Sequence, residues 1–440
     1  MDIEAVTVVG GGLAGCSAAL ELAKRGIQVK LFEMRPQHST LAHITDKLAE
    51  LVCSNSLGSN RKTRALGLLK EELRMLDCEI LKIAEDCAVP AGTALTVDRE
   101  RFASQVTDTI KKHPLIQVIR EEVLTIPQGT AILASGPLTS SALAKAIAGF
   151  CGTEYLYFYD AIAPIVSRAS LDLSILVKAA RYDAGEAGFL NAFMEKDEYM
   201  EFYRQLVNAE QHELNEADKD RSYFEGCLPV EEIARRGERS LAYGPLRPTG
   251  FKNAQGRRPF VVIQLRPENK EHTMYNLVGF QTNLRNKEQE RVFRMIPGLK
   301  TAEFLRYGRM HRNTYIQAPN LIHPTLQFRN RANLFVAGQL SGAEGYLCAF
   351  ATGLVAGMNA ARVCAAKSPI VLPYQTMLGA LLVRMAGYGE FASLNPRYSP
   401  IKPMLALLPT LNDAPRSKDL RREAYAERSI ASLKLFLENL

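Results

Sequence analysis

The sequence predicts an α/β protein in which a Rossmann-like dinucleotide-binding domain is interrupted by an inserted α+β domain. Three observations lead to this prediction: a glycine-rich turn between an apolar strand and a helix at the N-terminus, a second strand–glycine–helix unit late in the chain, and a change of character between them. A length of 440 residues is enough for two or three domains. We expect the first domain to combine residues 1–155 with 321–440, and the inserted domain to span 156–320.

The N-terminal unit reads as a strand, a glycine turn, a helix and a second strand. Residues 6–9 are β-branched, residues 10–15 are Gly-Gly-Gly-Leu-Ala-Gly, and the residues up to Arg25 have the apolar periodicity of a helix. The second strand ends at Glu33, at the spacing from the turn that a ribose-binding acid needs. This context predicts a dinucleotide site, whereas the glycine motif alone would also fit the turn of an ordinary βαβ unit.

Each glycine of this turn has a physical role in the predicted site. Gly10 allows the tight turn, Gly12 lets the backbone approach a diphosphate, and Gly15 lets the helix pack closely on the strand. The diphosphate would then meet N–H groups at the helix N-terminus, where the helix dipole favours negative charge. The expected cofactor-binding residues are Gly10, Gly11, Gly12, Leu13, Ala14 and Gly15, with Glu33 for the ribose hydroxyls.

Composition narrows the class of protein. Hydrophobic residues make up 47% of the chain and charged residues 23%, which is ordinary for a soluble globular protein. Fifty-four Lys and Arg against 47 Asp and Glu give a net charge of +7, which suits a nucleic-acid partner without requiring one. The eight cysteines are scattered without metal-ligand spacing, which indicates a reduced, cytoplasmic protein with no metal site. We also expect no membrane span, because the most apolar segment, residues 350–364, is short and contains Asn359 and Arg362.

Cys53 lies in the next stretch of the first domain, where an apolar helical turn is expected to give way to Ser-Asn-Ser. A cysteine near helix-end N–H groups can be partly exposed, with a lowered thiol pKa. The pattern alone favours the simpler interpretation, a small buried apolar residue.

The rest of the first half alternates helices and strands and ends in a turn of small residues, Ala134-Ser135-Gly136. A strand that ends in such a turn is typical of flavoproteins with two dinucleotide-binding folds. We expect helices over 65–86 and 98–112, and strands over 117–120, 123–126 and 130–134.

The inserted domain begins with an aromatic, extended segment over 155–166 and continues with a charge-rich helical segment over 195–222. Strands are expected over 259–265 and 275–282. Residues 235–258, which lie between the helical segment and the first of these strands, are dense in Arg and Lys, and from them we select Arg257 and Arg258 as RNA-phosphate contacts. The alternative is a solvated charged loop.

The cofactor domain then resumes over 333–340 with a strand that ends at Gly338, and a glycine turn and a helix of small residues over 349–364 follow. A late strand and helix of this kind close over the flavin end of the cofactor, where the helix N-terminus can stabilise negative charge on the reduced ring. Together with the N-terminal turn and the Ala-Ser-Gly turn, this unit favours FAD over NAD and adds Gly338 to the cofactor-binding residues.

Several long motifs resemble one known family, the folate- and FAD-dependent tRNA (uracil-5-)-methyltransferases. The resemblance covers about residues 6 to 365 and is carried by residues 10–15, 32–36, 51–57, 67–72, 155–164, 224–227, 279–282 and 307–314. It implies transfer of a one-carbon unit from 5,10-methylenetetrahydrofolate, with reduced FAD, to C5 of the T-loop uridine at tRNA position 54. NAD(P)H would regenerate the reduced flavin.

The resemblance also implies roles for particular side chains. Uracil C5 is a poor nucleophile until a thiolate adds to C6, and a second group must later remove the C5 proton. Cys227 is the expected C6 nucleophile and Cys53 the second thiol, although the two roles could be exchanged. His311 would stack on the folate pterin and Tyr346 would lie near the same site; without the resemblance, a buried, hydrogen-bonded histidine would be the better interpretation of His311.

Some residues depart from the family pattern. The family usually has Glu-Gly-Tyr-Val-Glu-Ser where residues 344–349 are Glu-Gly-Tyr-Leu-Cys-Ala, and often Leu-Asn-Cys-Pro where residues 190–193 are Leu-Asn-Ala-Phe. The last 70 residues match poorly.

Other functions remain open at this point. The same chemistry could act on a ribosomal RNA uridine, and a larger relative that modifies the tRNA wobble uridine would need a longer chain. A plain FAD oxidoreductase of small molecules would need neither Cys227 nor the basic insert, and a non-catalytic RNA-binding flavoprotein would need neither cysteine.

Overall fold

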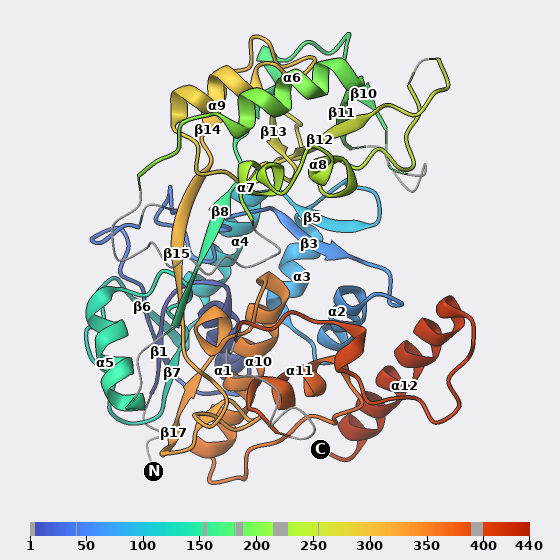
Figure 1. Cartoon of the computed structure of the whole chain (residues 1–440). Helices are drawn as coiled ribbons and strands as arrows, with labels where there is room; N and C mark the ends of the chain where they lie inside the picture. Colours follow the sequence, from blue (N-terminus) through green and yellow to red (C-terminus); the bar gives the residue numbers. More distant parts are fainter. Residues whose placement is uncertain are drawn as a thin grey trace.

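The computed structural model describes residues 5–40, 42–152, 156–179, 181, 188–213, 228–253, 255–388 and 399–440. Cys227 and the side chain of His311 lie outside the described parts. Two sheets form two separate layers, with the first sheet and its helices below the second in Figure 1. Each sheet has its own hydrophobic core: residues between Val6 and Leu433 supply the first, and residues between Val166 and Ala302 supply the second.

The first sheet has the strand order β16-β17-β7-β1-β2-β6. Its strands are β1 (Val6–Val9), β2 (Val29–Phe32), β6 (Ile116–Ile119), β7 (Ala131–Leu133), β16 (Gln327–Phe328) and β17 (Arg331–Val336). β1 lies between β2 and β7, with Val8 opposite Leu31 on one side and Ile132 on the other. All pairs are parallel except β16 with β17. This order confirms the predicted Rossmann-like fold, whose ligands bind at the carboxyl ends of the strands.

Two helices of small residues pack together beside this sheet, α1 (Leu13–Lys24) and α10 (Tyr346–Cys364) (Figure 1). Their backbones approach so closely that a Cβ at Gly353 would lie 2.2 Å from the carbonyl oxygen of Ala14. α10 is 19 residues long and apolar enough to cross a membrane, but 78% of its most apolar window is buried inside the protein. It is therefore the core helix of this layer.

The other helices of the first layer surround this pair. They are α2 (Ala65–Met75), α3 (Glu79–Asp86), α4 (Arg99–Lys112), α5 (Ser141–Cys151), α11 (Met377–Met385) and α12 (Lys418–Glu438), with short 3-10 turns η5 (Gly338–Ser341) and η7 (Leu405–Leu407). The buried carboxylate of Glu72 accepts hydrogen bonds from the N–H groups of Met377 and Leu378 at 2.7 and 2.8 Å. This contact fixes α2 against the start of α11.

The second sheet is antiparallel, with the order β10-β11-β12-β13-β9-β14. Its strands are β9 (Ile165–Ser167), β10 (Val177–Lys178), β11 (Leu190–Met194), β12 (Val261–Pro267), β13 (Met274–Leu277) and β14 (Phe304–Arg306). The helical pieces of this layer are η1 (Arg168–Ser170), α6 (Lys196–Val207), α7 (Val230–Arg235), α8 (Ser240–Tyr243) and α9 (Asn286–Phe293). In Figure 1, α6 and α9 lie at the top of the molecule, over this sheet.

A two-stranded ribbon joins the layers. β8 (Leu156–Ile162) pairs with β15 (Arg309–Tyr315), and both strands run lengthwise between the sheets in Figure 1. A small sheet of β3 (Ser56–Ser59), β4 (Ala88–Val89) and β5 (Ala94–Val97) also lies between them. The layers touch where the N–H of Lys270, in the turn after β12, donates to Asp98 at 3.1 Å.

The structure corrects some predicted elements. The helix expected over 65–86 is two helices, because Asp77 adopts the left-handed region at φ 56° and interrupts the backbone ladder. Residues 123–126 form no strand, since β2 already has β6 as its neighbour and β6 ends the sheet. The expected helix over 195–222 ends at Val207, and residues 214–222 of that range lie outside the described part of the chain.

Candidate active site

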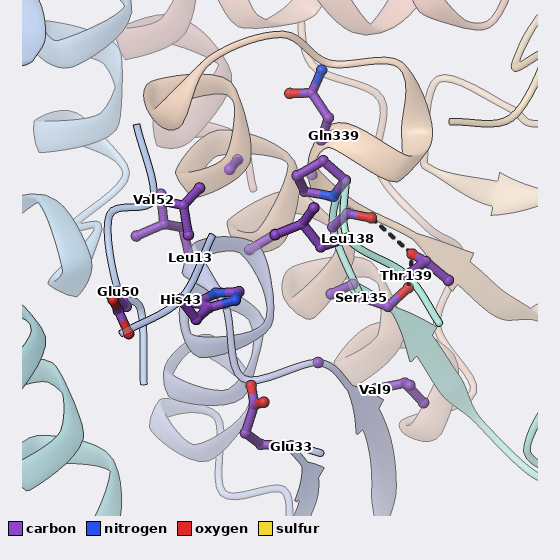
Figure 2. Close-up of a pocket in the computed structure, with 18 of the residues that line it drawn as sticks. Val9, Leu13, Glu33, His43, Glu50, Val52, Ser135, Leu138, Thr139 and Gln339 are labelled. Carbon is purple, nitrogen blue, oxygen red and sulfur yellow. Dashed lines mark hydrogen bonds between the residues drawn. The ribbon is translucent and has the colours of Figure 1, made fainter. Parts of the chain in front are cut away.

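A cavity of about 330 Å3 lies at the carboxyl ends of β1, β2 and β7. Figure 2 shows Leu13 at the start of α1 on one side of it, and Ser135, Leu138 and Thr139 of the turn after β7 on another. Gly338 and Tyr346 also line the cavity. The N-terminal glycine turn and the late strand–glycine–helix unit, which are far apart in the sequence, therefore meet at this cavity.

The glycine turn fits a diphosphate. Gly10 has φ 107°, and a Cβ there would lie 2.5 Å from the Ala134 carbonyl oxygen; a Cβ on Gly15 would lie 1.8 Å from the Gly10 oxygen. Packing within the protein thus requires glycine at both positions. A Cβ on Gly12 would meet no atom within 4 Å, although Gly12 lines the cavity. The space beside Gly12 is therefore not filled by other residues of the described chain and is free for a ligand.

Two helix N-termini point their N–H groups toward this space. Gly12 is the N-cap of α1 and Gly345 the N-cap of α10, and neither has a side chain that could cap the first turn. Both residues line the cavity. Two positive helix ends at one cavity make it suited to anionic groups.

Glu33 lies at the end of β2, as predicted, and is buried. Its Oε2 accepts the N–H of Gly11 at 3.1 Å, while the Arg35 side chain donates Nε to Oε1 at 2.9 Å and Nη2 to Oε2 at 3.1 Å. Burial alone would raise the pKa of Glu33, but the hydrogen bonds and charge of Arg35 outweigh burial and hold the pKa below its usual range. A ribose hydroxyl that donates to Glu33 would therefore share a carboxylate that already accepts from Gly11 and supports the glycine turn.

A loop that the sequence did not indicate closes this end of the cavity. Arg35 also donates to Glu50 at 3.2 Å and to the Thr45 oxygen at 3.0 Å. His43 and Glu50 line the cavity next to it (Figure 2). Burial and the Arg35 charge lower the pKa of His43 to about 4, so this ring is neutral at physiological pH. Isolated polar residues in an irregular loop carry no periodic pattern, which is why sequence reasoning missed them.

Cys53 lines the same cavity and is partly buried. The N–H of Cys53 donates to the hydroxyl of Tyr346 at 2.8 Å, which brings together two residues 293 positions apart. Burial, and next the negative charge of Cys53, raise the pKa of Tyr346. The expected helical turn before Cys53 is wrong: residues 48–54 form a loop, in which Ala49 has φ 51°.

Three arginines, none of them predicted, surround this loop. Arg99, Arg266 and Arg306 come from the start of α4, from β12 and from β14. Their separation in sequence leaves no local pattern that could have indicated a common site. The packing of the second sheet against the first layer brings Arg266 and Arg306 to the loop, whereas Arg99 reaches it from within the first layer.

The residues that follow Cys227 and those that precede His311 both contact the segment at Gln281 and Thr282. The N–H of Val230, three residues after Cys227, donates to the oxygen of Gln281 at 2.7 Å. Gly308 packs on Thr282 so closely that a Cβ would lie 2.4 Å from its methyl group. The backbone of His311 lies in β15 opposite Asp160. Two residues further along β15, Asn313 reaches the cavity.

Arg257 and Arg258 lie on an exposed turn of the second layer and do not line the cavity. The turn is closed by the N–H of Asn253, which donates to the Arg257 oxygen at 2.8 Å, and Arg258 donates to the hydroxyl of Thr249 at 2.9 Å. The site of chemistry and the basic stretch are therefore separate surfaces.

Among the described residues, no group of three or more His, Cys, Asp or Glu side chains is arranged to hold a metal ion. The sheet order, the glycine turn and the two helix N-termini at one cavity define the class of protein, a dinucleotide-binding fold of the flavoprotein type.

Comparison with known proteins narrows this class. A sequence model of the family "Glucose inhibited division protein A" matches residues 5–368. A protein of Anoxybacillus flavithermus named methylenetetrahydrofolate–tRNA-(uracil-5-)-methyltransferase TrmFO is 49% identical over 437 residues, covering 99% of this chain and 100% of that protein. A protein of the same name from a Synechococcus strain is 51% identical, over 98% of this chain and 93% of that protein. The solved structure of Aquifex aeolicus GidA superposes with a TM-score of 0.69 at 17% identity, covering 98% of this chain and 73% of that one, and shows a common fold.

The chain therefore belongs to the glucose inhibited division protein A family and, within it, to the group of full-length relatives that carry the methyltransferase name.

Proposed function

We propose that this protein is a methylenetetrahydrofolate–tRNA-(uracil-5-)-methyltransferase that uses FAD, 5,10-methylenetetrahydrofolate and NAD(P)H to methylate uracil C5 in tRNA. Relatives of this name match the chain over nearly its whole length. The observation that carries the proposal is the position of Cys53, which lines the dinucleotide cavity and contacts Tyr346 at 2.8 Å. A plain oxidoreductase of small molecules has no need for a thiol at this place.

The residues of the cavity fit FAD. Gly12 leaves room for the diphosphate, and the N-termini of α1 and α10 favour its negative charge and that of a reduced ring. Glu33 keeps the glycine turn in place through the N–H of Gly11. When bound, FAD would supply the reducing equivalents that convert the transferred one-carbon unit into a methyl group, and NAD(P)H would restore them.

The two thiols would activate the uracil. In the proposed order, Cys227 adds to C6 and makes C5 nucleophilic, and Cys53 takes the C5 proton after the carbon has been transferred. Loss of this proton returns the electrons that release Cys227 from C6. The contact of Val230 with Gln281 supports this assignment, because it holds the segment after Cys227 near the motif at Gly308.

The remaining assignments belong to the same proposal. His311 would stack on the folate pterin, with Tyr346 beside it, and Arg257 and Arg258 would contact tRNA phosphates. Residues 1–155 with 321–440 would form the FAD-binding domain and 156–320 the folate- and RNA-facing domain, a division that the two hydrophobic cores support. We place the protein in the cytoplasm, where its RNA substrate is found, with neither metal nor membrane involved.

The test is methylation of an unmodified tRNA transcript. Purified protein, FAD, 5,10-methylenetetrahydrofolate and NADH or NADPH should produce 5-methyluridine, measured by mass spectrometry of the digested nucleosides. Cys53→Ala and Cys227→Ala should lose the product, whereas Cys151→Ala, which changes a cysteine outside the cavity, should keep it. A wild-type protein with bound FAD that makes no 5-methyluridine in tRNA with either reductant would contradict the proposal, and a ribosomal RNA fragment run in parallel covers the alternative substrate.

A further inference from the structure

The loop from Leu51 to Asn55 is held from outside by arginine side chains. Each of its five residues accepts a hydrogen bond from one of three guanidinium groups. Arg99 donates to the carbonyl oxygens of Leu51 and Cys53, the latter at 2.8 Å. Arg306 donates to the oxygen of Val52 at 2.8 Å. The backbone of the loop is thus fixed at Cys53 and at the two residues before it.

Arg266 holds the other end of the loop. It donates to the Ser54 hydroxyl at 2.8 Å and to the Asn55 side-chain oxygen at 2.9 Å. Asn55 in turn donates to the oxygens of Val97 and Pro267 at 3.0 and 2.9 Å. Because Arg266 and Pro267 belong to β12, the second sheet is tied directly to the residues that follow Cys53.

The cluster carries more positive than negative charge. Glu268, which is buried, pairs with Arg99 at 2.9 Å and, among the described residues, is the carboxylate that acts on all three guanidinium groups. Three cations against one carboxylate leave an excess of two charges in a mostly buried place, which is costly without further anions. Burial lowers the pKa of both Arg266 and Arg306, and the charge of Arg99 lowers them further.

Two acidic groups of the cavity are close enough to balance this excess. The ionised form of either Cys53 or Tyr346 would raise the pKa of all three guanidinium groups. Tyr346 stays protonated because burial raises its pKa. His43, beside the Ala42 oxygen that accepts from Arg306 at 3.1 Å, is neutral. A thiolate at Cys53 is then the anion that the cluster favours.

We propose that Arg99, Arg266 and Arg306 are positioning residues that hold the Cys53 loop at the cavity and keep its sulfur as a thiolate. The inference rests on the proposed role of Cys53 as a catalytic thiol. Since Arg266 and Arg306 belong to the second sheet, the first layer alone lacks part of this arrangement. The second layer therefore completes the surroundings of the Cys53 thiol, in addition to its proposed role in facing the RNA.

The test measures the pH dependence of Cys53 alkylation by iodoacetamide, in the full-length protein with FAD bound, by mass spectrometry of the Cys53 peptide. Arg266→Met and Arg306→Met should each move the labelling midpoint upward by about one pH unit or more, because a cation next to the thiolate is lost. Arg266→Lys and Arg306→Lys keep the positive charge, so their Cys53 labelling midpoints should stay closer to that of the wild-type protein. Cys151, whose pKa burial raises to about 11, is an internal standard that no variant should change.

A matched control separates the effect of charge from that of lost packing. Arg331 also donates to backbone oxygens, those of Pro127 and Gly129 at 2.8 Å, but lies away from the cavity. Arg331→Met should leave the Cys53 midpoint unchanged. FAD absorbance identifies any variant that fails to fold, and the lysine variants then carry the test: a lysine variant whose Cys53 labelling midpoint equals that of wild type supports the charge role.

Unchanged midpoints in the two methionine variants, or a lysine midpoint shifted as far as the methionine one, would overturn the inference. Shifted midpoints together with a wild-type protein that methylates no tRNA would instead reject the proposed function and leave the thiolate cluster standing.

Discussion

The glycine turn at residues 10–15 and the Cys53 loop at residues 51–55 line the same cavity but are held by different forces. The turn is fixed by close backbone approaches, such as the 1.8 Å that would separate a Cβ on Gly15 from the Gly10 oxygen. The loop is fixed by charged side chains from distant elements, such as the 2.8 Å contact of Arg306 with Val52. The turn should therefore respond to added volume, and the loop to lost charge.

The largest effect is expected where volume is added to the turn. Gly12→Val should abolish flavin binding, because the side chain would occupy the space that a diphosphate needs, while the fold remains since a Cβ there meets no protein atom within 4 Å. Absorbance of the purified protein and reconstitution with FAD measure the effect. Gly149→Val is the matched control, since Gly149 also faces open space but lies in α5, outside the cavity. A yellow Gly12→Val protein would show that the turn does not hold the diphosphate.

A smaller effect is expected at the one place where the turn depends on a charge. Glu33→Gln leaves buried Arg35 without its nearest carboxylate and should cost about 3 kcal/mol of unfolding free energy at pH 7. The pKa of Glu33 is lowered in the folded state, so its contribution is present above the unfolded pKa and is lost as pH falls through the folded pKa. The difference between wild type and variant should hence shrink in acid.

Urea unfolding between pH 3 and 7 measures this difference. Glu71→Gln, which removes an exposed partner of Arg74, should change the unfolding free energy by less than about 1 kcal/mol. A Glu33→Gln protein as stable as wild type at pH 7 would mean that close packing alone holds the turn.

The smallest effect concerns a surface that neither region touches. Arg257→Glu with Arg258→Glu should weaken tRNA binding and reduce its salt dependence by about one unit of slope per lost phosphate contact, while flavin reduction stays intact. Lys111→Glu with Lys112→Glu, on the exposed end of α4, changes the net charge equally and is the control. Filter binding over a salt titration gives the tRNA affinity and its salt dependence. An equal loss of affinity in the two double variants would show that the turn with Arg257 and Arg258 is not part of the RNA site.

The contrast between turn and loop also explains what could be predicted from the sequence. Gly10, Gly12 and Gly338 were placed at one cavity because glycine turns between strands and helices are local patterns. The surroundings of Cys53 were not predicted, since Arg99 and Arg266 are joined to it only by the folded chain.

The local prediction at Cys53 was wrong even though the residue lines the predicted cavity. An apolar helical turn was expected before Cys53, but the structure has a loop whose carbonyl oxygens accept from arginines. The break at Asp77 was missed for a similar reason, because an apolar periodicity that continues across two helices does not record a single residue at φ 56°.

Covalent trapping of RNA tests the proposed methyl transfer most directly. A 5-fluorouridine tRNA should form a stable covalent adduct with the wild-type protein, because fluorine cannot leave C5 as the proton does. Cys227→Ala should form no adduct, keep its FAD and lose methylation, whereas Cys53→Ala should lose methylation and still trap the RNA. Loss of the adduct in Cys53→Ala alone would exchange the two roles within the same reaction. A Cys227→Ala protein that methylates tRNA at the wild-type rate would contradict the account.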